Sequence, residues 1–174
     1  EIGSGLVGSE MCIETATEDD KQVVTDLLDT LRANLDHCVG MAANMIGVKK
    51  NIIVVAAGPF QFAMINPVIT GKSGAFQTEE GCLSLEGVRP CTRYKEIEVD
   101  YLDQNFKKKH GKYTGWTAQI IQHEVDHCNG VVNEAKEHIN IVDNIEESIH
   151  FYNELFGLNV ISRQVLSNDC LTTR

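Results

Sequence analysis

The sequence has 174 residues, of which 43% are hydrophobic and 23% charged, the composition of a folded domain with its own core rather than of a disordered chain. A formal net charge of −10 argues against broad binding to nucleic-acid phosphates. No apolar run approaches the roughly 20 residues of a membrane helix, and the acidic, Gly/Ser-rich first ten residues lack the pattern of a secretory signal. We therefore expect a cytoplasmic protein with no membrane or nucleic-acid partner.

The predicted elements begin with an amphipathic helix over residues 17–36, where apolar residues recur at three- and four-residue steps from Val23 to Leu35. A small, Gly-interrupted segment follows at 37–50 and is predicted to be a tight loop. Short runs at 51–57, 62–69 and 94–103 have the composition or the alternation of strands. The basic cluster 107–110 is expected in a solvated turn, and 117–129 is a helix stopped by Asn129-Gly130.

Strands flanked by two long helices, without regular βαβ alternation, indicate an α+β fold. We expect antiparallel strands packed around the second helix. That helix contains an HExxH motif formed by His123, Glu124 and His127. Residues four apart lie on one helix face, so both imidazoles can bind one metal ion.

A catalytic metal needs a third protein ligand and an open position. Downstream, Glu134, Glu137 and His138 would complete a zinc-protease site, and upstream Cys82 stands in a Gly-flanked turn between strands. Residue chemistry alone leaves both possibilities open. The six cysteines are widely and irregularly spaced, which favours reduced thiols, at least one of them functional, over a disulfide framework.

The segments EGCLS (80–84), QHEVDH (122–127) and VGMAANMIG (39–47) resemble, in order and spacing, the three motifs of peptide deformylases. The resemblance extends from Met11 to Val132. It implies one divalent metal, natively Fe²⁺ and replaceable by Zn²⁺ or Ni²⁺, held by Cys82, His123 and His127. The implied reaction is hydrolysis of the N-formyl group of N-formylmethionyl peptides by a metal-bound hydroxide. Formate is released, and Glu124 is the implied general acid/base.

The resemblance also implies how a nascent formylmethionyl peptide would bind, with transient ribosome contact as a further implied interaction. The backbone N–H of Leu83 would donate to the oxyanion, and Arg93 would pair with Glu80 behind the cysteine turn. The peptide would be added as a strand, and the methionine side chain would enter an apolar pocket. The residues implied to pair with the peptide strand are Val39, Gly40, Glu86 and Gly87. Those implied to line the methionine pocket are Val39, Trp116, Ile120 and the His123 ring.

The first motif departs from the family at Met45, where a glutamine normally donates to the oxyanion. Methionine has no donor, and the loss of one such donor typically lowers turnover by ~10²–10³. Neighbouring Asn44 is not expected to compensate, because adjacent side chains of an extended segment point to opposite sides. On this interpretation Met45→Gln raises kcat. The alternatives for the chain are a deformylase-like relative with weak or no activity, a peptide binder or another amidohydrolase. For Met45 itself we favour simple core packing.

Residues 137–164 predict a strand, a helix and a second strand. This pattern resembles the first strand–helix unit of the glyoxalase/bleomycin-resistance superfamily, and a plain C-terminal helix is the alternative. We therefore divide the chain into a deformylase-like domain, 1–135, and a C-terminal strand–helix extension, 136–174.

Overall fold

The computed structural model describes residues 13–82 and 85–129, with only the backbone described within 81–89. The helical elements are η1 (Glu18–Asp20), α1 (Lys21–Ala33), η2 (Ala43–Ile46) and α2 (Gly115–Cys128). The strands are β1 (Gly40–Ala42), β2 (Ile52–Ala57), β3 (Phe60–Cys82), β4 (Leu85–Leu102) and β5 (Lys108–Thr114).

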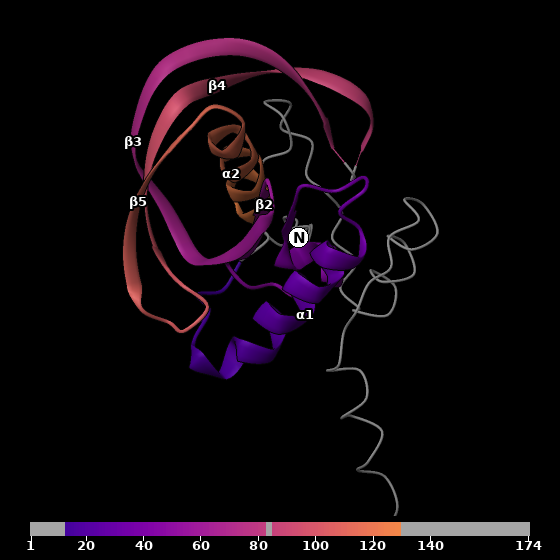
Figure 1. Cartoon of the computed structure of the whole chain (residues 1–174), viewed down its shortest axis with the longest axis vertical. Coiled ribbons are helices and arrows are strands. Elements are labelled where there is room, and N and C mark those ends of the chain that lie inside the picture. The colour runs from indigo at the N-terminus through magenta and orange to yellow at the C-terminus, as the bar shows by residue number, and fades with distance from the viewer. Residues whose placement is uncertain (1–12, 83–84, 130–174) are drawn as a thin grey trace, which may run out of the picture.

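The five strands form one antiparallel sheet in the order β1-β2-β3-β4-β5. The long β3 and β4 sweep around α2, while α1 lies on the other side of β2 (Figure 1). Register shifts in the β3–β4 pairing between Ile65 and Val68 and between Ile69 and Gly71 are bulges that help the sheet to bend. This curvature places α2 inside the sheet, where strands approach it from several sides.

Two hydrophobic clusters share β2 as a common wall. Ile52 and Val54 belong to the cluster with α1, whereas Ile53 and Val55 belong to the cluster with α2. Alternate side chains of a strand point to opposite faces, so a strand buried on both faces needs apolar residues throughout. This explains why residues 52–57 are an unbroken apolar run rather than an alternating one.

The α+β prediction is confirmed, as are both helices and the helix stop at Asn129. The predicted turn at 107–110 is wrong, because Lys108 opens β5 and its neighbours pair with β4. The predicted loop at 37–50 contains β1 and the 3₁₀ helix η2. Among the described residues no helix has the length and hydropathy to cross a bilayer. The predicted extension 136–174 lies outside the described residues.

Candidate metal centre

The two histidines of the HExxH motif face one another on α2. Nε2 of His123 and Nε2 of His127 are 3.2 Å apart, and the rings meet edge to face with centroids 4.9 Å apart. His127 is buried. The one-face arrangement predicted from the spacing is therefore confirmed, and both Nε2 atoms converge on one point.

A buried ionic cluster, formed by Glu80, Arg93, His123 and Asp126, fixes the orientation of His123. Nδ1 of His123 lies 2.9 Å from Oε2 of Glu80. An ionised carboxylate only accepts hydrogen bonds, so Nδ1 donates, and in the neutral imidazole Nε2 then keeps its lone pair. Arg93 donates to both Glu80 oxygens, at 2.9 and 2.7 Å, and also to Asp126. The predicted Arg93–Glu80 pair is confirmed.

Glu80 stays ionised in this cluster despite its burial. Burial alone would raise the pKa of Glu80, but hydrogen bonds from His123 and Arg93 and the positive charge of Arg93 outweigh it. The pKa of Glu80 is therefore held well below its usual range. The result is a charged hydrogen-bond acceptor behind His123, the arrangement usual behind metal-binding histidines.

The described residues fit a tetrahedral metal. Metal–nitrogen distances of about 2.0–2.1 Å separate two tetrahedral ligand nitrogens by about 3.3–3.4 Å, and the two Nε2 atoms are 3.2 Å apart. Among the described side chains no three ligating groups gather. The predicted third ligand, Cys82, ends β3 two residues after Glu80, in the stretch whose side chains are not described.

The three cysteines with described side chains are free, buried thiols: Cys38, Cys91 and Cys128. Burial raises the pKa of Cys38 and of Cys128 to about 12, with a further contribution from the negative charge of Glu124. Burial also raises the pKa of Cys91 to about 11. All three are therefore thiols rather than thiolates at neutral pH in the metal-free chain, and for them the prediction of reduced cysteines is confirmed.

Glu124 is buried where β1 passes close to α2. A Cβ built on Gly40 would lie 2.7 Å from Oε1 of Glu124 and 2.7 Å from Cγ2 of Ile120. Only hydrogen fits at position 40, which explains the glycine there. Three predicted site residues, from the first motif and from the HExxH helix, are thus brought together.

We expect Gly40→Ala to force β1 and Glu124 apart and to lower the free energy of unfolding by about 1–3 kcal/mol, as overpacking usually does. Denaturant unfolding measures the change. Gly71→Ala is the matched control, because its new Cβ would meet only the Glu98 side chain, with Oε2 at 3.1 Å. Equal stability of the two variants would contradict the close approach at Gly40.

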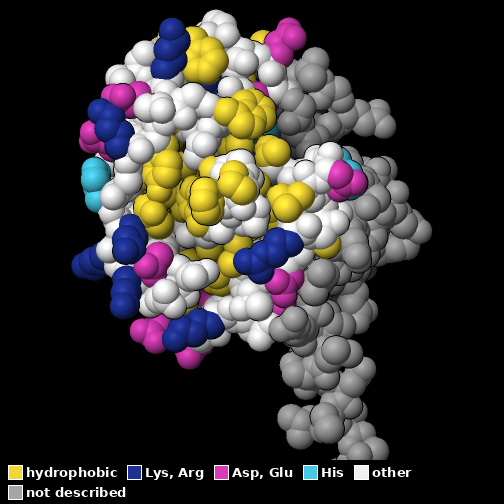
Figure 2. Space-filling model, viewed as in Figure 1, with side chains coloured by type: hydrophobic (Ala, Val, Ile, Leu, Met, Phe, Trp, Pro, Cys, Tyr) yellow, Lys and Arg dark blue, Asp and Glu magenta, His cyan; other side chains and the backbone are white. Residues whose placement is uncertain are grey.

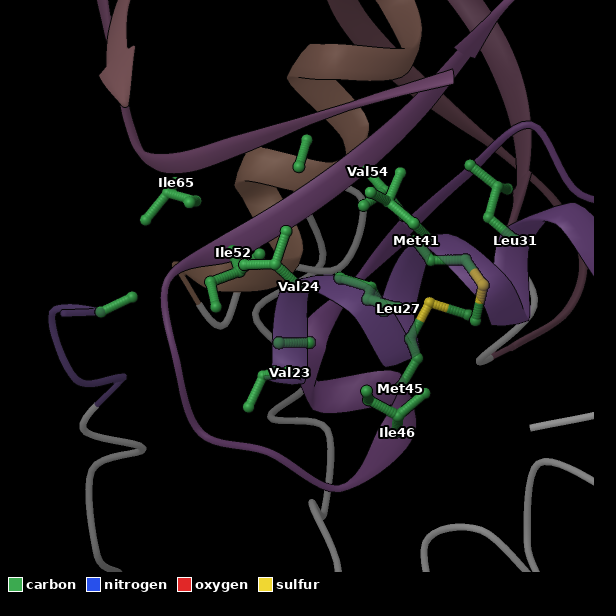
Figure 3. Close-up of a cluster of buried hydrophobic side chains, with 14 of the residues drawn as sticks. Val23, Val24, Leu27, Leu31, Met41, Met45, Ile46, Ile52, Val54 and Ile65 are labelled. Atoms are coloured by element: carbon green, nitrogen blue, oxygen red, sulfur yellow. The ribbon is translucent and has the colours of Figure 1, made fainter. Parts of the chain in front are cut away.

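Met45 lies in the cluster against α1, which corrects its predicted place in the catalytic site. Its side chain is 2% exposed and points from η2 toward Met41 and Leu27 (Figure 3). The core interpretation of Met45 is thus the one that the structure supports. The expectation that Asn44 and Met45 point to opposite sides assumed an extended segment. Residues 43–46 form a 3₁₀ helix instead, so that argument about the direction of Asn44 no longer holds.

We expect Met45→Gln to destabilise the fold rather than to raise kcat. The glutamine amide would enter an apolar cluster, and a buried amide without partners costs about 1–3 kcal/mol. Thermal and denaturant unfolding measure the loss. Met45→Leu, which nearly conserves volume, is the control and is expected to cost less than about 1.5 kcal/mol. A stable Met45→Gln with a higher kcat would restore the original expectation.

The predicted peptide-binding residues are only partly assembled within the described region. Ile120 is buried beside Gly40, whereas Val39 is 41% and Trp116 60% exposed. Trp116 and Ile120 are four residues apart and share one face of α2. Leu83 lies outside the described residues, and Glu86 and Gly87 belong to β4 in the stretch with backbone alone.

β1 is the first strand of the described sheet, and one of its edges faces away from β2. The Val39 carbonyl accepts from the Ala56 N–H at 2.8 Å, and Gly40 is registered with Val55. In an antiparallel pair alternate residues bond the neighbouring strand, so the backbone groups of Gly40 and Ala42 point outward. Part of this edge is used internally, since the Cys38 thiol donates to the Gly40 carbonyl at 3.1 Å.

Sequence reasoning missed two residues that hold α2 in place. The Gln122 amide accepts from the Tyr94 N–H and donates to the Tyr94 carbonyl, both at 2.9 Å, which fastens α2 to β4. Asp126 receives the third hydrogen bond of Arg93. The sequence signal for Gln122 was its place next to His123, on a helix that had to be buried.

Figure 2 shows hydrophobic side chains gathered on one face of the molecule, with charged side chains mainly around them.

Comparison with known proteins places these features in context. A family model described as polypeptide deformylase matches residues 8–138. A peptide deformylase of Clostridium beijerinckii is 59% identical over 119 residues, which cover 68% of this chain and 88% of the relative. One of Pelotomaculum thermopropionicum is 41% identical over 131 residues, covering 72% of this chain and 84% of the relative.

Solved structures give the same likeness. The crystal structure of peptide deformylase from Thermotoga maritima has a TM-score of 0.60 and 31% identity, covering 67% of this chain and 79% of that one. A Met-Ala-Ser-bound class I type b peptide deformylase from Acinetobacter baumannii has a TM-score of 0.61 and 29% identity, covering 69% of this chain and 82% of that one.

Proposed function

We infer the mechanism of this chain from the fact that it belongs to the peptide deformylase family, hydrolases that remove the formyl group from N-formylmethionyl peptides. We propose that Glu124 is its general acid/base. Glu124 is 4% exposed, it belongs to the helix that carries the two histidines, and its carboxylate lies beside Gly40 of β1. Glu124 would take a proton from the attacking water and later return a proton to the nitrogen of the leaving amine.

The metal would be held by His123 Nε2, His127 Nε2 and the Cys82 thiolate, with Fe²⁺ as the native ion and Zn²⁺ or Ni²⁺ as substitutes. When bound, it would lower the pKa of water and act as a Lewis acid. Glu80 and Arg93 would keep His123 in the tautomer that presents its Nε2 lone pair. The support is the separation of the two Nε2 atoms and the carboxylate behind His123.

The peptide would lie along the outward edge of β1 as an added strand, with Val39 and Gly40 on one side and Glu86 and Gly87 on the other. The Leu83 N–H would donate to the carbonyl oxygen of the formyl group. The support for this binding mode is the edge of β1 that no strand of the described residues pairs with, and the relative from Acinetobacter baumannii, whose structure contains Met-Ala-Ser. Backbone pairing tolerates varied side chains beyond the first residue.

The methionine side chain would pack against Val39, Trp116, Ile120 and the His123 ring. The exposed indole of Trp116, one helical turn before Ile120, is an apolar surface available for such a contact.

We also propose that the substrates are nascent chains met at the ribosome in the cytoplasm. The division into a deformylase-like domain, 1–135, and an extension, 136–174, stays a proposal.

The observation that carries the function is the short distance between the two Nε2 atoms, together with Glu124, which is buried on the same helix against Gly40. The test is metal analysis of the purified chain together with formate release from formyl-Met-Ala-Ser. We expect close to one divalent ion per chain, formate release, and loss of both on chelation. Bound metal without formate release would contradict the deformylase activity, and a chain that takes up no metal would contradict the site itself.

A further inference from the structure

Asn44 carries a buried amide that the fold does not use. The residue is 3% exposed, and among the described residues neither its Nδ2 nor its Oδ1 has a hydrogen-bond partner. A buried amide without partners is destabilising, and in native proteins such a group calls for an explanation such as binding or catalysis. Asn44 lies in the first motif, four residues after Gly40.

The local backbone directs this amide away from α1. Successive side chains of a 3₁₀ helix are about 120° apart, so residues three apart share a face. Ala43 and Ile46 share one face of η2 and belong to the α1 cluster, as does Met45. Asn44 lies on the remaining side of η2, about 120° from the Ala43–Ile46 face and from Met45, and its burial excludes a position in solvent. Its side chain is therefore directed toward the α2 side.

The α2 side at this point holds the candidate catalytic group. Along β1, Gly40 and Ala42 face α2, since position 40 touches Glu124 and Ala42 belongs to the α2 cluster, whereas Met41 faces α1. η2 continues directly from β1 and contacts α2. The unpartnered amide thus lies on the same side of the first motif as Glu124.

We propose that Asn44 is a catalytic residue whose Nδ2 donates a hydrogen bond to the formyl carbonyl oxygen as negative charge develops there. The assignment rests on the proposed function. It supplies from position 44 the side-chain donor that Met45 lacks. A donor that stays unpaired in the free protein is preorganised for the transition state, where such groups act without further reorganisation.

The test compares Asn44→Ala and Asn44→Asp with the parent in formate release from formyl-Met-Ala-Ser. We expect kcat to fall by about 10²–10³ in Asn44→Ala, as for other oxyanion donors, with KM and metal content unchanged. Asn44→Asp should also lose turnover, because an ionised carboxylate cannot donate. The second readout is the unfolding midpoint of the metal-free chain, which is expected to be no lower in Asn44→Ala than in the parent, since no hydrogen bond is lost.

Asn51→Ala is the matched control, because Asn51 also has a buried side-chain oxygen without a partner among the described residues but lies immediately before β2. Parent-like kcat in Asn44→Ala, or an equal loss in Asn51→Ala, would overturn the assignment. So would a drop in the unfolding midpoint of Asn44→Ala large enough to account for the lost activity. If the parent released no formate, the proposed function itself would fail, which is a different result.

Discussion

Glu124→Gln is expected to lower kcat for formyl-Met-Ala-Ser by about 10²–10⁴, the usual contribution of a positioned general acid/base. Glutamine has nearly the same shape as glutamate, so the close contact with Gly40 is preserved. It cannot accept and return a proton at neutral pH. Formate release under saturating substrate measures the effect, and metal content should equal that of the parent because Glu124 is not a proposed ligand.

A second readout separates the lost charge from a misfolded site. The negative charge of Glu124 adds to burial in raising the pKa of Cys38 and of Cys128. In Glu124→Gln both thiol pKa values should fall toward the usual value while staying above it, since burial is the larger cause. Titration of thiolate absorbance follows the shift. Glu18→Gln, an exposed substitution in η1, is the control for kcat. A parent-like kcat in Glu124→Gln would remove the acid/base role.

Arg93→Met is expected to cost about 3–5 kcal/mol of unfolding free energy, because it leaves Glu80 and Asp126 without their shared cation. The Arg93 side chain is 6% exposed and that of Glu80 is 7% exposed, so water cannot replace the lost hydrogen bonds. Denaturant unfolding of the metal-free chain measures the loss. Metal affinity should also fall by about 10–100-fold, since Glu80 no longer holds His123 in a fixed orientation.

Lys112→Met is the matched control, because Lys112 pairs with Glu96 at 2.8 Å while both side chains are largely exposed. An exposed pair is worth about 0–1 kcal/mol. The double variant Arg93→Met with Glu80→Gln should be more stable than the sum of the two single losses predicts, since it removes both charges of the buried pair. Similar losses of unfolding free energy in Arg93→Met and Lys112→Met would show that the buried cluster stabilises the fold no more than an exposed ion pair does.

Periodic features of this fold were predictable from sequence, and contacts between distant segments mostly were not. The four-residue spacing of His123 and His127 depends only on helix geometry, and the apolar run of β2 depends only on burial of both faces. The Arg93–Glu80 pair was reached through family resemblance. The contact between Gly40 and Glu124 joins residues from the two ends of the domain, and no local pattern encodes it.

The first motif shows most clearly why local reasoning fails. The direction of Asn44 and Met45 depends on whether residues 43–46 are extended or helical, and a short segment of small residues suits both. Packing against α1 selects the 3₁₀ helix and buries Met45 there. The ends of β3 and β4 also lay beyond prediction, since their length is set by pairing with each other rather than by composition.

The shared wall formed by β2 has a consequence for cooperativity. Its amides pair with β1 and β3, and each of its faces is covered by a different helix, so separating β2 from its neighbours disturbs both hydrophobic clusters at once. Native-state hydrogen exchange at Val54 and Val55 should therefore report global unfolding, while amides near Lys108 exchange through smaller openings. The α1 helix, which carries none of the candidate site residues, thus helps to determine how often the HExxH helix α2 loses its support.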